Sequence, residues 1–187
     1  MANKVKYGLK NVYYAAAHIA TNGTATYDTP VAWPGAVNLS LDAEGDTSKF
    51  YADNIAYAQF AANAGYSGSF ESALIPEGFK TDILGETADT TGVIYELSEA
   101  SAKPFALLFQ FEGDASATRH VLYNCVASRP SISGATTEES IEAQTETIDI
   151  TASSIHNAAL NADIVKARCP ETLTTTYGSW YTSVYQA

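Results

Sequence analysis

The residue types that usually carry metal chemistry are scattered in this sequence. Three histidines stand at unrelated positions: His18, His120 and His156. A zinc site needs three or four convergent ligands, and no local spacing supplies them. Asp42-x-Glu44-x-Asp46 is similar to the start of a calcium loop, but Gly45 falls between two of the would-be ligands and no Glu follows at the twelfth position. We expect no metal site, and we interpret this run as a turn with exposed acids.

Motifs for nucleophilic and phosphate chemistry are also missing from the sequence. It contains no GxSxG, no GxxxxGK[ST] and no strand-linked GxGxxG. Its 21 acids offer many carboxylate pairs for acid–base work, and no spacing singles one out. We predict no catalytic residues, no cofactor-binding residues and no cofactor, and we expect a protein that is not an enzyme.

The charge of the chain excludes several kinds of partner. Its 187 residues carry a net charge of −11, and six acids without a base fall within 130–165. Proteins that grip nucleic acid neutralise phosphates with Lys and Arg, so specific DNA binding is not expected. The same charge argues against anionic membranes, and no long apolar run spans a bilayer. Cys125 and Cys169 are expected to be reduced, buried thiols.

Alternating apolar residues predict a mainly β chain. Val37, Leu39 and Leu41 mark a strand with one wet face. Residues 105–111 predict a strand buried on both faces, and 121–126 predict its hairpin partner. Residues 76–84 predict one short helix, because Pro76 suits its start and Gly85 its end. These elements require strand–strand contacts between distant segments.

For other segments the sequence does not decide between two structures. Residues 55–64 suit either a helix or a strand, and the apolar phase shifts by one residue within 141–152, which predicts a bulge or a crossing between sheets. The aromatic segment 177–185 should dock on its own sheet or on a neighbouring molecule. Loops are expected at 21–35, 42–48, 85–92, 134–140 and 152–162.

A set of short motifs runs in order along nearly the whole chain. They occupy residues 6–13, 34–41, 49–53, 74–76, 82–85, 103–109, 123–125, 129–130, 138–141, 144–147, 180 and 184–185. As a set they resemble the major tail proteins of long, non-contractile-tailed bacteriophages and prophages of Gram-positive bacteria. The chain departs from that pattern at 152–165, whose conformation the resemblance leaves open, and at its last two residues.

The resemblance implies a tail-tube-like fold and a structural role. The fold would be a β-sandwich or barrel with one short flanking α-helix, in a single domain over 1–187 with N-terminal and C-terminal arms, and 55–64 would be a strand. Hexameric rings would stack into a tail tube around the tape measure protein and conduct the genome. Tail terminator and distal tail proteins would be further partners. The protein would reside in the host cytoplasm before assembly and in the virion tail afterwards.

Charge gives this implied tube a physical rationale. DNA carries about one negative charge per 1.7 Å, so a basic wall would hold it. Six copies of a chain with charge −11 carry roughly −66 per ring, effective only within about 8 Å at physiological salt. We predict that many acids face the lumen, with the following candidates: Asp42, Glu44, Asp46 and Glu146. The alternative places them on the outer wall or between rings.

Subunit contacts are a second expectation. Lys4, Lys6 and Lys10 could meet an acidic block of a neighbour and fix its orientation, and Trp180 and Tyr185 are further inter-subunit candidates. Two other readings remain: a soluble β-sandwich that binds carbohydrate through Tyr and Trp, and a capsid or connector protein that forms rings without stacking.

Overall fold

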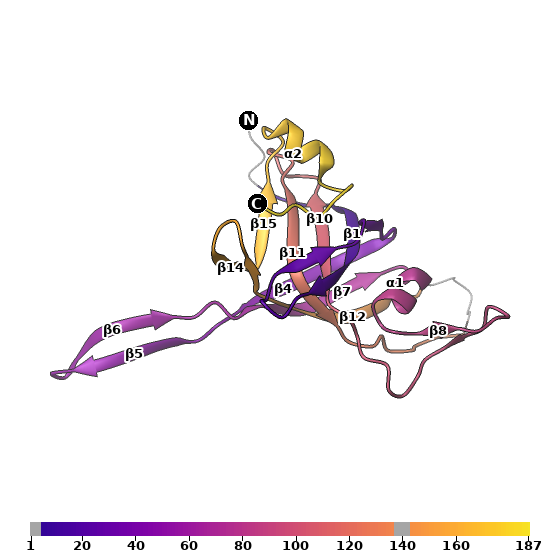
Figure 1. Ribbon diagram of the computed structural model, residues 1–187, viewed down its shortest axis with the longest axis horizontal. Coiled ribbons are helices and arrows are strands. Elements are labelled where there is room, and N and C mark those ends of the chain that lie inside the picture. Colours follow the sequence, from indigo (N-terminus) through magenta and orange to yellow (C-terminus); the bar gives the residue numbers. More distant parts are fainter. Residues whose placement is uncertain (1–4, 137–142) are drawn as a thin grey trace.

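The computed structural model describes residues 5–136 and 143–187, and its main element is one antiparallel β-sheet (Figure 1). The nine strands of this sheet are β1 (Leu9–Ile19), β2 (Ala25–Tyr27), β3 (Val31–Ala32), β4 (Ala36–Glu44), β7 (Gly65–Ser72), β10 (Phe105–Phe111), β11 (Arg119–Ala127), β12 (Glu146–Ser153) and β15 (Lys166–Cys169). Seven follow the order β2-β1-β10-β11-β12-β7-β4, while β3 pairs with β1 and β15 with β11. The predicted mainly β fold is confirmed.

The central strand β10 is buried on both faces, as its sequence predicts. Phe105, Leu107 and Phe109 belong to one apolar cluster, and Ala106 and Leu108 belong to a second. Successive side chains of a strand point to opposite faces, so an unbroken apolar run serves two cores. The predicted hairpin is also confirmed, because β10 pairs with β11 in antiparallel register.

The first cluster fills the inside of the curled sheet. Val12 and Tyr14 of β1 are buried members of this cluster, and the half-buried Leu39 and Leu41 of β4 pack against it, although β1 and β4 share no ladder. The sheet therefore curls into an open barrel. Its apolar residues exclude water and supply most of the stabilisation of the fold.

One end of this barrel is closed by α1 (Glu77–Asp82), which lies inside the predicted 76–84. Phe79 is fully buried, with its ring centroid 4.4 Å from that of Trp33. The Trp33 indole N–H donates to Ser72 Oγ at 2.9 Å. Pro76 immediately precedes the helix, and Gly85 follows it with φ +80°, a conformation that side chains other than that of glycine rarely adopt.

The second cluster lies on the other face of β1, β10 and β11, where the C-terminal segment covers it. A second short helix that the sequence did not reveal, α2 (Thr174–Ser179), leads into Trp180, which is 1% exposed. Its indole N–H donates to the His120 carbonyl at 3.3 Å. The Arg119 guanidinium lies 3.6 Å from the ring centroid of Tyr177. The aromatic C-terminus thus docks on its own sheet.

Within the described residues, three hairpins form separate ladders outside the main sheet: β5 (Thr47–Ala52) with β6 (Ile55–Ala61), β8 (Thr87–Ala88) with β9 (Ile94–Tyr95), and β13 (Ile155–Asn157) with β14 (Ala162–Ile164). The resemblance implies a strand over 55–64, which is confirmed for residues 55–61, while residues 62–64 belong to no strand.

Four of the expected loops are partly wrong. The expected loop 42–48 contains the end of β4 and the start of β5, because hydrogen bonds to β7 and β6 hold these polar residues in strands. Strands also interrupt 21–35, 85–92 and 152–162. Residues 134–136 are in neither helix nor strand, and the rest of 134–140 lies outside the described residues.

The expected bulge within 141–152 is not found in β12, which starts at Glu146 and pairs with β7 in unbroken register. The change of apolar phase falls at the start of this strand, since residues 143–145 belong to no strand and 141–142 lie outside the described residues. The shift therefore marks where the chain enters the sheet.

Candidate functional site

The outer face of β4, β7 and β12 is bare, polar and acidic. Their inner-facing residues, such as Leu41, Phe70 and Ile150, enter the first apolar cluster. The alternate residues point outward and are mostly Ser, Thr and Asn, with four acids among them: Asp42, Glu44, Glu71 and Asp149. None of the three strands contains Lys or Arg. We call these outward residues of the three strands the acidic face.

The acidic face is the half of the sheet that the chain leaves uncovered. The outer face of β1, β10 and β11 is covered by the C-terminal segment, in which Trp180 is buried. On β12 the outward Asp149 is exposed while its neighbours Ile148 and Ile150 are each 1% exposed. In a sheet with one core face and one solvated face, buried apolar residues alternate with exposed polar residues along each strand.

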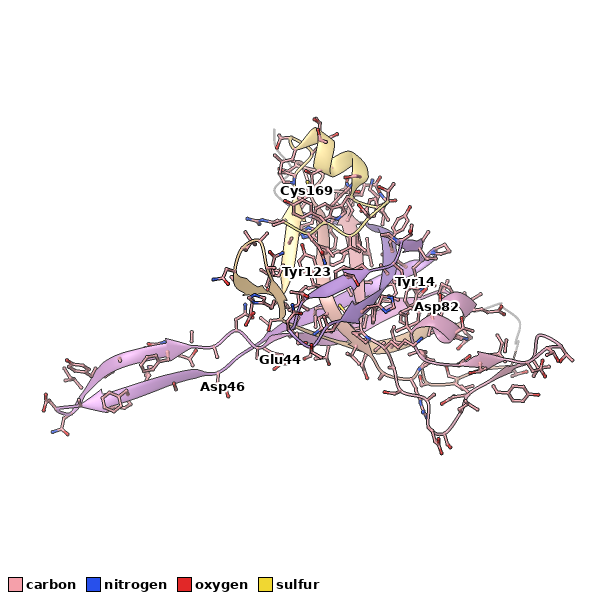
Figure 2. The ribbon with its side chains drawn as sticks, in the orientation of Figure 1. Tyr14, Glu44, Asp46, Asp82, Tyr123 and Cys169 are labelled. Carbon is pink, nitrogen blue, oxygen red and sulfur yellow. The ribbon has the colours of Figure 1, made fainter. Side chains whose placement is uncertain are left out.

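Two of the four predicted lumen acids lie on this face, and a third lies beside it. Asp42 is opposite Ser67 of β7, and the Glu44 carboxylate accepts a hydrogen bond from the Ser67 hydroxyl. Asp46 follows in the link between β4 and β5, and Figure 2 shows it where that hairpin leaves the sheet. The structure therefore brings three of the four candidates to one region.

The fourth candidate, Glu146, faces the other way. It is in phase with the buried Ile148, so its side chain points to the α1 side, where Glu146 Oε2 accepts the Ile75 N–H at 2.6 Å. Its second oxygen lies 4.0 Å from Lys80 Nζ. Glu146 pairs in register with Ser72 and Glu44 with Gly65, so about 23 Å of strand separates the two positions. Glu146 therefore belongs to a structural contact.

The sequence reasoning missed Glu71 and Asp149. Thr145 Oγ1 donates to Glu71 Oε1 at 2.6 Å, which ties the start of β12 to β7. Asp149 stands between two isoleucines, so period-two alternation alone could have placed it on the solvated face. Glu71 carried a weaker signal, because Phe70 is the single large apolar residue among its close neighbours.

The hairpin of β5 and β6, residues 47–61, extends away from the sheet as an arm (Figure 1). Its two-residue turn, Asp53-Asn54, has φ of 53° and 61°, values that Asp and Asn tolerate in such tight turns. At its root, Gly45 has no room for a side chain, because a Cβ there would lie 2.0 Å from the Ala62 carbonyl oxygen. The backbone therefore fixes where the arm leaves the body.

One face of the arm is apolar and exposed. The register sets Phe50 opposite Ala58, and Phe60 shares their face because strand side chains alternate. Phe50 is 58% exposed, Phe60 62% and Ile55 61%. An isolated two-stranded hairpin is at best marginally stable in water. Such a face is typical of an interaction surface.

The predicted inter-subunit residues fall in different places. Lys4 lies outside the described residues. Lys10 already pairs with Glu112 of its own chain at 3.3 Å, an exposed contact of little energetic worth. Trp180, expected at a subunit boundary, is buried in its own chain, because its ring packs on the apolar residues of the second cluster and shields them from water. Tyr185 is 40% exposed and stacks on Trp180.

The cysteines and the potential metal ligands are the remaining groups to consider. Cys125 and Cys169 are buried and free, as predicted, and burial raises the pKa of the Cys125 thiol to about 12. In residues 5–136 and 143–187, no three His, Cys, Asp or Glu side chains are grouped as metal ligands. Neither helix in that part of the chain is long and apolar enough to cross a membrane.

No family model matches the chain, and no curated protein matches its sequence. Among solved structures, the chain is similar to the sheath/tube terminator of an extracellular contractile injection system (PVC) in its extended state, with a TM-score of 0.46 and 11% identity over 82% of this chain and 97% of that one. It is also similar to the tube-terminating cap of the anti-feeding prophage, with a TM-score of 0.46 and 10% identity over 91% of this chain and 95% of that one. Neither of these two is a major tail protein of a non-contractile tail.

Proposed function

We propose that this chain is a structural subunit of a bacteriophage-type tail, which assembles into stacked hexameric rings around a tape measure protein. The observation that carries the proposal is the difference between the two halves of the sheet. One half buries both faces within the chain, and the other half leaves an acidic face that contains no base. A face of this kind suits the wall of a channel through which a polyanion must pass without sticking.

The arm supplies the means of assembly. Its apolar face is stabilised when it packs on another molecule, because burying apolar surface contributes about 25 cal/mol per Å². Its root lies two residues after Glu44, so the arm would hold its neighbour on the side of the chain where the acidic face ends. The acidic faces of successive subunits would then line one channel. The tail terminator and distal tail proteins would meet the ends of that tube, and the protein would reside in the virion tail.

The carbohydrate-binding alternative is weakened because the two tryptophans that it relied on are buried. Sugar-binding platforms use exposed aromatic rings, and both tryptophans are core residues here, Trp33 at 2% and Trp180 at 1% exposure. The exposed rings of the arm instead belong to a projecting hairpin (Figure 1).

Electron microscopy of the purified protein tests the proposal. We expect hexameric rings or hollow tubes, with the acidic face toward the bore in a reconstruction. Rings that never stack would favour a connector protein. Dispersed monomers at all concentrations, or a bore lined by Lys and Arg, would overturn the proposal.

A further inference from the structure

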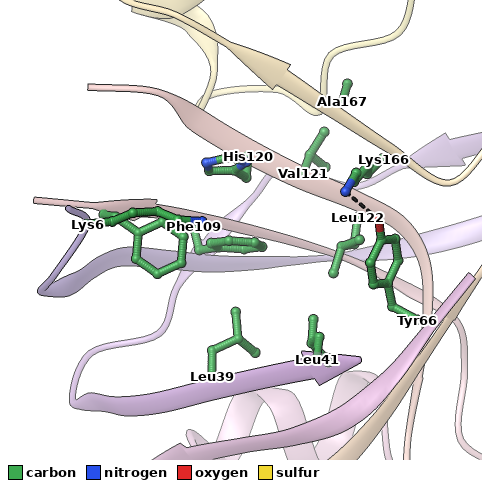
Figure 3. Close-up of a pocket in the computed structure, with 11 residues that line it drawn as sticks. Lys6, Leu39, Leu41, Tyr66, Phe109, His120, Val121, Leu122, Lys166 and Ala167 are labelled. Carbon is green, nitrogen blue, oxygen red and sulfur yellow. Dashed lines mark hydrogen bonds between the residues drawn. The ribbon is translucent and has the colours of Figure 1, made fainter. Parts of the chain in front are cut away.

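A cavity of about 310 Å³ opens between β4 and the paired strands β11 and β15. Figure 3 shows Leu39 and Leu41 on one side of it, and Val121 and Lys166 on the other. Its wall is largely apolar, and two lysines, Lys6 and Lys166, stand beside it without an acid among the lining residues. The cavity is at the small end of the range for ligand pockets, about 300–1,000 Å³, so it suits one or two side chains.

The two lysines are held by aromatic rings and not by carboxylates. Lys166 Nζ contacts the Tyr66 hydroxyl and lies 4.4 Å from the centroid of that ring. Lys6 Nζ lies 5.1 Å from the Phe111 ring centroid. Within the described residues neither lysine forms an ion pair. His120 also lines the cavity, and burial lowers its pKa, so the charge of the cavity comes from the lysines.

The tip of the arm has the complementary chemistry. Asp53 is the one acid of residues 47–61, and it occupies the turn itself. Ala52 and Ile55 pair directly beside it and lie on the same face as Phe50. The tip therefore presents a carboxylate next to exposed apolar groups. It points away from the body of its own chain (Figure 1), so its own cavity is not its partner.

We propose that the arm tip of a second copy of this chain enters the cavity, with Ile55 and Phe50 on the apolar wall and Asp53 beside Lys6 and Lys166. This inference rests on the proposed assembly and names the contact that makes it. The contact joins two different surfaces of identical subunits, so each subunit offers one arm and one cavity. Such head-to-tail contacts close into rings or continue as open polymers.

Engineered cysteines test the position of the contact. Ala52→Cys at the arm tip and Leu41→Cys at the cavity wall, combined in one chain, should give a ladder of disulfide-linked multimers under mild oxidation. The native Cys125 and Cys169 are buried and do not compete. The matched control combines Ala52→Cys with Glu99→Cys, an exposed site away from the cavity. A ladder from the control that equals that of the test variant would overturn the proposal.

A double-mutant cycle tests the charge pairing. Asp53→Asn keeps a residue that tolerates the turn, and Lys166→Gln keeps a long polar side chain. Each change should weaken assembly about tenfold, as loss of one partner of a close interfacial charge pair does, and the combined variant should be no weaker than the singles. Additive losses would overturn the pairing. The wild-type protein is measured first: if it never assembles, the proposed function fails, whereas normal assembly of all variants without a ladder overturns only this contact.

A free amphipathic anion is the competing occupant. Laurate added to the monomer serves as the probe. Tight laurate binding that Asp53→Asn does not alter, together with no disulfide ladder, would show a ligand pocket and overturn the proposal.

Discussion

Glu146 Oε2 accepts the backbone N–H of Ile75 at 2.6 Å, and this contact ties the start of β12 to the segment that leads into α1. It explains why an acid that was expected in a channel wall stands on the core side of the sheet. Its partner is the backbone N–H of a buried residue, which loses its hydrogen bond if the carboxylate is removed.

Removing the Glu146 carboxylate should destabilise the fold without altering the acidic face. We expect Glu146→Ala to lower the free energy of unfolding by about 1.5–3 kcal/mol, the range for hydrogen bonds to charged groups. Glu146→Gln keeps an acceptor and should lose less. Urea denaturation measures both. Equal midpoints for Glu146→Ala and the wild type would contradict the contact.

Polar substitution on the arm should separate folding from assembly. Phe50→Ser with Phe60→Ser removes two exposed rings, so the free energy of unfolding of the monomer should change by no more than about 0.5 kcal/mol for each. Each ring would contribute about 1.5–3 kcal/mol when buried against a neighbour, so multimers should disappear.

Sedimentation velocity and thermal denaturation give these two readouts. Val93→Ser with Leu97→Ser is the matched control, because these residues are exposed at 50% and 51% but lie outside the arm. Equal loss of multimers in the control would contradict the role assigned to the arm.

The acidic face should become inaccessible to large reagents when the protein assembles. Asp42→Cys should react with a large polyethylene-glycol maleimide in the monomer and much more slowly in intact tubes, because the reagent must enter the bore. Glu99→Cys, exposed and away from the acidic face, should react in both states. Rapid labelling of Asp42→Cys in tubes would place this face on the outer wall.

Reversing charge on the acidic face should hinder passage of DNA. Asp42→Lys with Asp149→Lys adds two phosphate-binding groups where the wild type has none. Tubes should still form, while ejection of the genome from particles slows, most strongly at low salt. Glu99→Lys with Glu171→Lys changes net charge equally at other exposed sites. Equal slowing by both variants would contradict a lumenal acidic face.

Asp89 makes the hairpin of β8 and β9 sensitive to acid. The Thr91 hydroxyl donates to its carboxylate at 2.6 Å and the Val93 N–H donates at 3.0 Å, and these bonds lower the pKa of Asp89 to about 2. A lowered pKa means that the contribution is complete above the ordinary value of 3.8 and is lost as the pH falls through about 2.

An NMR titration of the Asp89 carboxyl carbon measures this directly. The midpoint should lie near 2, and the amide signals of Thr91 and Val93 should shift with it. Asp89→Asn should remove that shared transition. A midpoint near 3.8 would contradict the hydrogen bonds of this turn.

Truncating Trp180 distinguishes a core residue from an interface residue. Because the ring is 1% exposed in a single chain, Trp180→Ala should lower the free energy of unfolding of the monomer by about 3–5 kcal/mol. Chemical denaturation at concentrations below assembly is the measurement. Unchanged monomer stability with lost assembly would restore Trp180 to the subunit boundary.

The sequence by itself determined the strands and the helix that are marked by patterns of neighbouring residues. Residues 105–111 are apolar at every position but one, so a strand buried on both faces was predictable, and Pro76, Phe79 and Gly85 marked a short helix. The absence of Lys and Arg from three strands is also a property of the sequence, visible once the strands are known.

Period-two alternation indicates the side for an acid flanked by apolar residues, such as Asp149, but tertiary structure alone decided what lies over each side of the sheet. Asp42 and Glu146 are both acids in polar-rich strands, yet one lies opposite Ser67 on the solvated face and the other accepts the Ile75 N–H on the core side. Strand register sets this choice, and a shift of one residue reverses it. Pairings between distant segments fix that register, so local composition could not reveal it. The same holds for Trp180, whose burial depends on His120 and the second cluster sixty residues away.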